Sequence, residues 1–229
     1  GNDCNAVIGL SGGKDSTIIA TLCARALGPE RVIGVAMPDT YQGINDADKI
    51  AKYLGIKYME VPIWGITGSY KRTVDANSPE YCKLIKWSEQ AEQNIPPRIR
   101  MTTLYAIAQT FNGRVACCDN ASEAFIGYST LFGDNVGSFA PLKNLTVTEV
   151  RAIGHELGLP DKWVEKIPDD GLPHSMPDEE QFGFTYAQLD QYIRTQILED
   201  EGALSKIVSL HNKNRFKTSI VNIPGYVYE

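Results

Sequence analysis

The sequence predicts an α/β protein with a doubly wound, Rossmann-like parallel sheet and helices on both faces. Short apolar runs of strand length alternate with segments in which apolar residues recur at helical spacing. Glycine and proline separate these segments. The first apolar run leads through a glycine-rich turn directly into a helical pattern, which is typical of the first unit of such a sheet. At 229 residues the chain can bury a full core, so we expect a single domain over 1–229.

The first part of the chain predicts three strands separated by helices. The strands are expected at 5–10, 31–37 and 56–63, and the helices at 16–27 and 46–54. Gly28-Pro29 and Gly55 end the two helices, because glycine accepts positive φ and proline cannot continue a helix. Strands joined through helices need right-handed crossovers, and these give a parallel sheet covered on both faces.

The remaining chain predicts one more strand among helices. Helices are expected at 79–94, 98–111, from 146 and at 185–198, with a break at Pro96-Pro97 and a strand at 115–118. Thr146 with Glu149 and Thr185 with Gln188 form capping boxes that open the last two helices. The stretches 128–142 and 166–183 are irregular and long enough to be functional loops.

Composition and charge exclude several classes of protein. The net charge of −6 argues against a nucleic-acid surface, which needs a basic face. No apolar run reaches the ~20 residues of a membrane helix, and no signal peptide is visible. The five cysteines are odd in number and form no C-x-x-C pair, so neither a disulfide framework nor a zinc site is indicated. We therefore expect a cytoplasmic protein with reduced thiols that binds neither nucleic acid nor membranes.

Residues 11–16, Ser-Gly-Gly-Lys-Asp-Ser, lie between the first strand and the first helix. Glycines let backbone N–H groups approach a ligand, and a helix N-terminus favours negative charge, so this turn predicts a cradle for the phosphates of a nucleotide. It is not a Walker A loop, because only three residues separate Gly9 from Gly13-Lys14 and Asp15 follows the lysine. An ordinary glycine turn with a Ser or Asp helix cap is the alternative.

The loops that follow the strands should meet at one place. In a doubly wound sheet, ligands bind outside the carboxyl ends of the strands, where the strand order reverses. The loops after the first, second and fourth strands contain residues 11–16, 37–42 and 119–134. We expect them to converge on one crevice.

The pattern Ser-Gly-Gly-x-Asp-Ser resembles the pyrophosphate loop of the N-type ATP pyrophosphatases, the adenine nucleotide alpha hydrolase-like group. Further blocks resemble the ammonia-dependent NAD synthetases in that group, and the resemblance runs from about residue 6 to residue 224. In order, these blocks are Met37-Pro38 with Gln42, Arg98-x-Arg100-Met101, Ser122-Glu123 leading to Tyr128 and Phe132-Gly133-Asp134, Pro141-Leu142 leading to Leu145-Thr146, and Asp178-Glu179 leading to Gly183-Phe184.

The resemblance implies an ATP-dependent amidation in two steps. The nicotinate carboxylate of deamido-NAD attacks the α-phosphate of ATP, which gives an adenylated intermediate and pyrophosphate. Ammonia then attacks the activated carbonyl and releases NAD and AMP. Such a site needs donors for the leaving pyrophosphate, oxygen ligands for Mg²⁺ and an acceptor that keeps ammonia unprotonated.

The implied phosphate and metal residues lie mostly in the first loop. Those that hold the pyrophosphate are Gly9, Ser11, Gly12, Gly13 and Ser16. Lys14 is implied to reach a phosphate, with an exposed lysine as the alternative. Asp15 and Glu123 are the implied Mg²⁺ ligands. The alternatives are a helix N-cap for Asp15, which could hold together with the metal role, and a solvated helix face for Glu123.

Aromatic and amide side chains are implied to contact the bases. Met37 and Gln42 would contact the adenosine. Tyr128 and Phe132 would stack on the adenine or nicotinate ring, or else belong to the core. Lys166 opens the stretch 166–183, which suits a lid over ATP, and a disordered surface loop is the alternative.

Charged residues are implied to contact the acceptor and ammonia. Asp134 is the candidate for the ammonia pocket, and a turn-forming aspartate is the alternative. Arg98 and Arg100 stand at a predicted helix start, where the dipole disfavours cations, so contact with an anionic substrate is preferred over surface charge.

The resemblance also implies a homodimer. Family members usually carry an N-terminal helix that helps to build it, and this sequence reaches its first strand almost at once. No segment resembles a glutaminase, so free ammonia is the expected nitrogen donor unless a partner subunit supplies it.

Four positions depart from the pattern, and two other functions stay open. Many family members carry Thr at Cys118, a basic residue at Leu131, an acid at Ser138 and Ser or Thr at Asp169. Leu131 and Ser138 flank Asp134, so these two departures fall in the region implied to bind deamido-NAD. The alternatives are another N-type pyrophosphatase, of the tRNA-thiolating or amidotransferase type, and a nucleotide-binding module without catalysis.

Overall fold

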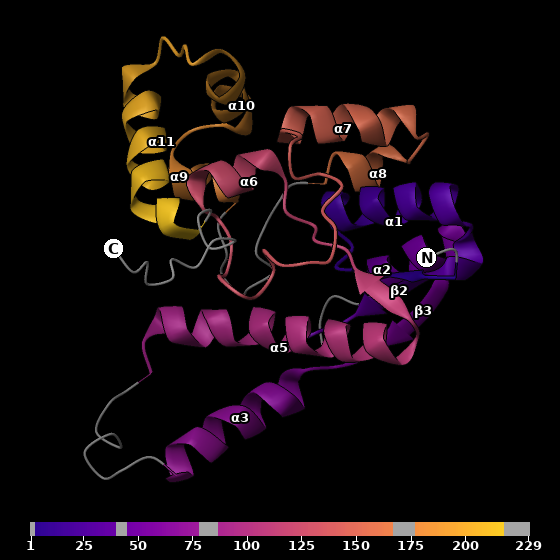
Figure 1. Ribbon diagram of the computed structural model, residues 1–229. Helices are drawn as coiled ribbons and strands as arrows, with labels where there is room; N and C mark the ends of the chain where they lie inside the picture. Colours follow the sequence, from indigo (N-terminus) through magenta and orange to yellow (C-terminus); the bar gives the residue numbers. More distant parts are fainter. Residues whose placement is uncertain (1–2, 40–44, 78–86, 167–176, 218–229) are drawn as a thin grey trace, which may run out of the picture. The chain divides into compact units, whose positions relative to one another are not determined.

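The computed structural model describes residues 3–39, 45–77, 87–166 and 177–217. The chain divides into two compact units. Figure 1 labels the helices and strands along the chain. Unit 1 contains Gly1–Cys118 and Thr130–Pro141, and unit 2 contains Asp119–Ser129 and Leu142–Glu229. Each unit is described by itself.

Unit 1 is built on a four-stranded parallel sheet in the order β3-β2-β1-β4. The strands are β1 (Asn5–Gly9), β2 (Val32–Ala36), β3 (Lys57–Glu60) and β4 (Gly113–Val115). Val7 of β1 lies opposite Ile33 of β2 and Val115 of β4. The strand order reverses between β1 and β4, so the predicted doubly wound sheet with its switch point is confirmed.

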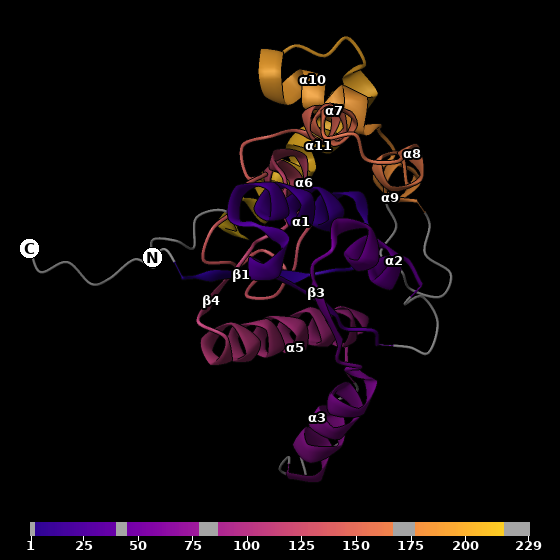
Figure 2. The same cartoon turned by 90° about the vertical axis from the view of Figure 1, so that its right-hand side faces the viewer.

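Helices cover both faces of this sheet. Helices α1 (Lys14–Leu27) and α2 (Asn45–Leu54) lie on one face, and α5 (Glu89–Thr110) lies on the other (Figure 2). The short helix η1 (Pro29–Arg31) follows Gly28, whose φ is +90°. Between the sheet and α5, a core forms around Val7, Val35 and Val115, with Leu104 and Ile107 of α5 packed against it.

Helix α5 corrects the prediction of a break at Pro96-Pro97. It runs unbroken from Glu89 to Thr110 and contains both prolines. Each proline removes a backbone hydrogen bond, and a proline inside a helix lowers the stability of that helix by about 3 kcal/mol or more. Ala108 is buried in the sheet core, and Ile99, Leu104 and Ile107 of α5 pack against that core, so we attribute the continuity to this packing. Residues 79–86 of the predicted helix 79–94 lie outside the described residues, and Phe111, the predicted last residue of the helix 98–111, is exposed beyond the end of α5.

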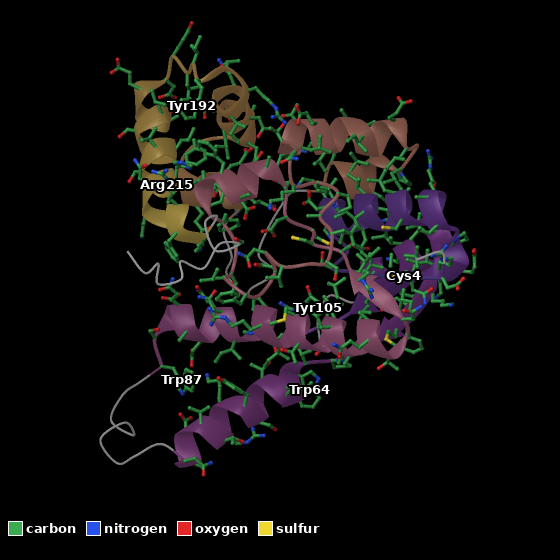
Figure 3. All side chains as sticks on the ribbon, in the orientation of Figure 1. Cys4, Trp64, Trp87, Tyr105, Tyr192 and Arg215 are labelled. Carbon is green, nitrogen blue, oxygen red and sulfur yellow. The ribbon has the colours of Figure 1, made fainter. Side chains whose placement is uncertain are left out.

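Helix α3 (Trp64–Asn77) is absent from the sequence prediction. It lies beyond α5, away from the sheet, and Figure 3 shows Trp64 near its start and Trp87 near the start of α5. The indole N–H of Trp87 donates to Asp75 Oδ1 at 2.8 Å, and the Lys71 ammonium lies 6.0 Å from the centre of the Trp87 ring. These contacts join the far end of α3 to the chain that leads into α5.

Unit 2 is helical in its described residues. Its elements are α6 (Ala121–Ile126), α7 (Val147–Glu156), α8 (Asp161–Val164), α9 (Asp178–Phe182), α10 (Tyr186–Thr195), α11 (Glu201–Asn214) and η2 (Arg215–Lys217). The capping boxes at Thr146 and Thr185 are confirmed. A core of Ile126, Val147, Tyr186, Leu189 and Ile207 joins α6, α7, α10 and α11.

The two predicted loops have different outcomes. The stretch 128–142 is irregular as expected, apart from a single bridge between Phe139 and Ala116. Within 166–183, helix α9 forms, and residues 167–176 lie outside the described part. No helix in the described ranges is long and apolar enough to cross a membrane.

Candidate active site

The turn after β1 is tightly fixed. Leu10 N donates to Val35 O at 2.8 Å, which holds the end of β1 against β2. Gly12 is buried with φ +81°, and a Cβ there would lie 3.0 Å from Cβ of Asp46. Ser11 is exposed, and its Oγ accepts from Gly13 N at 3.2 Å and lies 3.1 Å from Oγ of Ser16. The structure therefore brings the predicted glycines and both serine hydroxyls into one turn.

Helix α1 begins directly in this turn. Its N-cap is Gly13, which has no side chain to cap the first N–H groups. The hydroxyls of Ser16 and Thr17 both donate to Gly13 O, at 3.2 and 2.7 Å. The alternative of Asp15 as the N-cap is therefore wrong, because Asp15 is the second residue of the helix. A helix start without a side-chain cap suits an anion, because its first N–H groups and its dipole attract negative charge.

Lys14 and Asp15 form an ion pair at the start of α1. Lys14 is only 4% exposed, so the alternative of a solvent-exposed lysine is wrong. Its Nζ lies 2.7 Å from Oδ2 of Asp15. A buried ammonium needs a negative partner, and here the carboxylate provides one. The pair places an ammonium group and a carboxylate at the start of the helix that follows the phosphate loop. The carboxylate oxygens are of the kind that can ligate a metal ion.

Arg100 joins the end of β2 to the loop that contains Asp134. Its Nε donates to Met37 O at 3.0 Å. Burial lowers the pKa of the guanidinium, while the negative charges of Asp39 and Asp134 raise it. Arg98 and Arg100 lie in the middle of α5 and do not begin a helix, so the dipole argument from the sequence is wrong.

Asp134 closes a turn in the loop 130–137. Its Oδ1 accepts from Thr130 N at 2.6 Å, so the turn-forming role that the sequence left open is present. The loop is held to α5, because Arg98 Nε donates to Leu131 O at 3.1 Å and Thr130 Oγ1 donates to Asn94 Oδ1 at 2.7 Å. Asp134 itself is exposed. A carboxylate fixed at a loop surface beside a guanidinium can both bind and orient a polar ligand.

Met37 and Phe132 are placed in contrasting environments. Met37 is buried in the core under α5, and a Cβ on Gly9 would lie 3.6 Å from its methyl group. Phe132 is an exposed aromatic with φ +58°. The core alternative is therefore wrong for Phe132, and its stacking role stays a prediction. Gln42 lies outside the described residues.

In unit 2, Glu123 belongs to the capping box of α6. Asn120 Oδ1 accepts from Ser122 N and Glu123 N, each at 3.0 Å, and Glu123 Oε2 accepts from Asn120 N at 3.3 Å. The carboxylate is half-buried, so the alternative of a solvated helix face is wrong. The sequence reasoning missed this box, although Asn followed three residues later by Glu is its usual signature.

Tyr128 belongs to a polar cluster inside unit 2. Its hydroxyl donates to Asp178 Oδ1 at 3.1 Å, and its ring meets Phe182 edge to face at 4.7 Å. The hydroxyl of Tyr186 donates to Asp178 Oδ2 at 2.8 Å. Burial, followed by the charges of Glu123 and Asp178, raises the pKa of Tyr186 far above its usual range. Tyr128 is thus half-buried and packs against the core of unit 2, and its stacking role stays a prediction.

The remaining sites divide between the two units. Asp15 lies in unit 1, and Glu123 and Lys166 lie in unit 2. Lys166 is exposed after α8, at the end of a described stretch. Over the described ranges, no group of three or more His, Cys, Asp or Glu side chains is arranged to hold a metal ion.

A parallel sheet with a glycine turn and an uncapped helix at its switch point defines a nucleotide-binding α/β protein. Comparison with known proteins specifies the group. The family described as NAD synthase matches residues 2–221, and the chain belongs to this family. Its members are ligase-type enzymes that use ATP as a co-substrate.

Individual relatives agree with the family. The chain is 38% identical over 195 residues to an NH(3)-dependent NAD(+) synthetase of Methanococcus aeolicus. The matched region covers 84% of this chain and 74% of the relative. The NMN synthetase structure from Francisella tularensis has a TM-score of 0.83 at 29% identity, over 97% of this chain and 90% of that one. The NH3-dependent NAD synthetase of Campylobacter jejuni has a TM-score of 0.74 at 26% identity, over 98% and 89%.

Proposed function

We propose that the chain amidates the nicotinate carboxylate of deamido-NAD with ammonia, using ATP and releasing AMP and pyrophosphate. The observation that carries this proposal is the phosphate loop, in which Gly12 and Gly13 lead into α1 and the buried Lys14–Asp15 pair follows. Membership of the NAD synthase family supports it, as does the name of the Methanococcus aeolicus relative.

The phosphate loop has the chemistry that the first step needs. Attack on the α-phosphate transfers negative charge to the leaving pyrophosphate, and this charge must be stabilised. The backbone of Gly12 and Gly13, the hydroxyls of Ser11 and Ser16 and the ammonium of Lys14 are the proposed donors. These groups are held by contacts within the turn, so little reorganisation is needed when charge develops.

Asp15 of unit 1 and Glu123 of unit 2 are each proposed as an oxygen ligand for Mg²⁺. Mg²⁺ prefers oxygen ligands and usually takes one or two carboxylates together with substrate phosphates. Both side chains fit this requirement, since each offers carboxylate oxygens at a helix start that hydrogen bonds or an ion pair fix in place. When bound, the ion would neutralise phosphate charge.

Asp134 is the proposed acceptor for ammonia. Ammonium has no lone pair, so the attacking nitrogen must lose a proton before or during its attack on the activated carbonyl. A carboxylate anchored to Thr130 N is positioned to accept a hydrogen bond from ammonia and to orient it. The guanidinium of Arg100 interacts electrostatically with Asp134. Arg100 is proposed to bind a phosphate of the acceptor.

A mononucleotide acceptor is the second candidate. The structure from Francisella tularensis is named an NMN synthetase, and it resembles this chain with a TM-score of 0.83. Leu131 and Ser138, which flank Asp134, also depart from the pattern expected for deamido-NAD. The chemistry would be the same amidation on nicotinate mononucleotide.

The first experiment measures pyrophosphate release from ATP and Mg²⁺. Deamido-NAD, nicotinate mononucleotide and ammonium are supplied or omitted in turn, and the amide product is identified by mass spectrometry. We expect release that requires deamido-NAD, with NAD formed only when ammonium is present. Faster turnover of the mononucleotide would replace the first proposal by the second. ATP binding without turnover under every condition would reject both.

We further propose that the chain forms a homodimer through α3. This helix lies wholly within the described residues and has no buried side chain, and Trp64, Ile66 and Tyr70 on it are 48%, 46% and 50% exposed. Exposed apolar side chains gathered on one element are typical of an interface. Sedimentation should show a dimer for the wild type and a monomer for Tyr70→Glu with Ile66→Glu. A monomeric wild type would contradict the proposal.

A further inference from the structure

Ser122 and Asp190 form a buried polar link between three helices of unit 2. Ser122 is fully buried, and Asp190 of α10 is 5% exposed. The Ser122 hydroxyl donates to Asp190 Oδ1 at 2.5 Å and accepts from Val147 N at 3.0 Å. The other oxygen of Asp190 accepts from Thr148 N at 2.7 Å and from Thr148 Oγ1 at 2.6 Å. The carboxylate therefore connects the starts of α6 and α7.

This link fully satisfies the first turn of α7. Val147 N donates to Ser122, Thr148 N to Asp190, and Glu149 N to Thr146 Oγ1 at 3.5 Å. A carboxylate at a helix N-terminus is also favoured by the helix dipole. A buried carboxylate with three donors is costly to disturb, because removal of one partner leaves the others unpaired. The start of α7 is thus a fixed platform for Ser122.

Ser122 transmits this position to its neighbour Glu123. Both lie in the first turn of α6, where Asn120 Oδ1 accepts from their two N–H groups. Ala121 N donates to Leu145 O at 2.8 Å, just before α7 begins. The Ser122 hydroxyl ties this turn to α10 through its hydrogen bond to Asp190.

We infer that Asp190 is a positioning residue for the Glu123 carboxylate and acts through the hydroxyl of Ser122. This inference rests on the proposed role of Glu123 in holding Mg²⁺. Groups that orient a metal ligand usually change metal affinity by about 10- to 100-fold when they are removed. The structure offers a matched pair for the test, since Ser122 and Thr148 each donate one hydroxyl hydrogen bond to Asp190 and only Ser122 belongs to α6.

The test measures Mn²⁺ binding to the full chain by electron paramagnetic resonance, with α,β-methylene-ATP present. Ser122→Ala should weaken Mn²⁺ binding by about tenfold. Thr148→Val also removes a hydroxyl hydrogen bond to Asp190, and it should leave Mn²⁺ affinity within about twofold of the wild type. Circular dichroism melting verifies that the variants fold. Equal weakening in both variants, or none in either, would overturn the inference.

Two further variants keep the result interpretable. Asp190→Asn is used if Ser122→Ala does not fold, because an amide nitrogen cannot accept the hydrogen bonds that a carboxylate oxygen accepts. It should weaken Mn²⁺ binding to a similar degree, and unchanged affinity would refute the inference. Glu123→Gln tests the proposed function itself. If Glu123→Gln lowers Mn²⁺ affinity and Ser122→Ala does not, only the inference fails; if Glu123→Gln has no effect, both fail.

Discussion

At the scale of single residues, Gly12 shows how little conformational freedom the phosphate loop has. Its φ of +81° is unfavourable for any other L-residue, and an added Cβ would crowd Cβ of Asp46. Gly55 shares the positive φ, at +67°, but an added Cβ there would meet no atom within 4 Å. Backbone strain is thus expected from a side chain at either glycine, whereas steric crowding is expected only at Gly12. A comparison of the two positions separates these effects.

We expect Gly12→Ala to lower stability by about 1–2 kcal/mol and to weaken ATP binding by about tenfold. Isothermal titration calorimetry with ATP measures the affinity, and urea unfolding measures the stability. Gly55→Ala is the control, because it introduces the same backbone strain at a distance from the loop. It should lower stability by about 1 kcal/mol and leave ATP affinity unchanged. Equal ATP affinity in the wild type and Gly12→Ala would contradict the assigned role of the loop.

Cys23 gives a prediction for alkaline pH. Burial in α1 raises the pKa of its thiol from 9.0 to about 11. Between these values the unfolded chain loses the thiol proton while the folded chain keeps it, so the thiol's contribution to stability is lost as pH rises through that window. The loss amounts to about 2.7 kcal/mol, because each pKa unit corresponds to about 1.4 kcal/mol.

Urea unfolding at several pH values checks this expectation. Cys23→Ala should lose less stability than the wild type between pH 9.0 and about 11, the window of the thiol. Their slopes should agree at about pH 7, where the thiol is protonated in both states. Identical slopes throughout the alkaline window would show that the Cys23 thiol does not titrate as described.

At the scale of elements, local signals in the sequence predicted what local interactions decide. The capping boxes at Thr146 and Thr185 and the terminating glycines are recognised from nearby residues alone, and these elements form as expected. The continuity of α5 through Pro96 depends on packing against distant strands, which no local pattern encodes. Helix α3 was also missed. It has no buried side chain and its large apolar residues are exposed, so its sequence carries no apolar stripe of the kind that predicts a helix packed on a core.

The site shows the same division. The glycine turn was predictable because it lies in one short segment, and the structure confirms its geometry. The Asn120–Glu123 box is also local, and its signature was simply overlooked. The links from Asp178 to Tyr128 and from Asp190 to Ser122 join residues 50 and 68 positions apart, so a single sequence could not reveal them. The ligand roles of these side chains stay predictions.

The carboxyl end of α6 is held by two elements that follow much later in the chain. Its exposed carbonyls are satisfied from α11 and η2, because Asn214 Nδ2 donates to Ile126 O at 2.9 Å and Lys217 Nζ donates to Gly127 O and Ser129 O at 2.8 and 2.7 Å. A cation near the carboxyl end of a helix also matches the dipole. Lys217 thus fixes the turn that follows Glu123's helix.

Lys217→Met should lower the free energy of unfolding by about 1 kcal/mol, since two carbonyls lose their charged donor. Thermal melting monitored by circular dichroism measures the change, which corresponds to about 2–4 °C at this chain length. Lys213→Met is the control. Lys213 is exposed on α11, and its substitution removes the same charge as Lys217→Met. A melting temperature equal to that of the control would show that the two hydrogen bonds contribute nothing.

At the scale of the whole molecule, the arrangement of the chain bears on how the two units unfold. The chain passes between them at 118–119, 129–130 and 141–142, so neither unit is one continuous segment. Unit 1 includes Thr130–Pro141, whose loop is held to α5 by Arg98 and Thr130. Unit 2 has a core of its own around Tyr186 and Leu189. The cytoplasmic location of the protein stays a prediction.

We expect the single domain over 1–229 to unfold in one cooperative transition. Loss of unit 1 would release both ends of the segment 119–129, which carries α6, and unit 2 would then lose part of its core. Differential scanning calorimetry tests this by comparison of the calorimetric and van't Hoff enthalpies, which agree for a two-state transition. ATP with Mg²⁺ at about 100 times its dissociation constant should stabilise the whole transition by about 2.7 kcal/mol, because ligand binds only the folded state. Two separate transitions, of which ATP shifts only one, would instead define two independent domains and place the nucleotide in the one that moves.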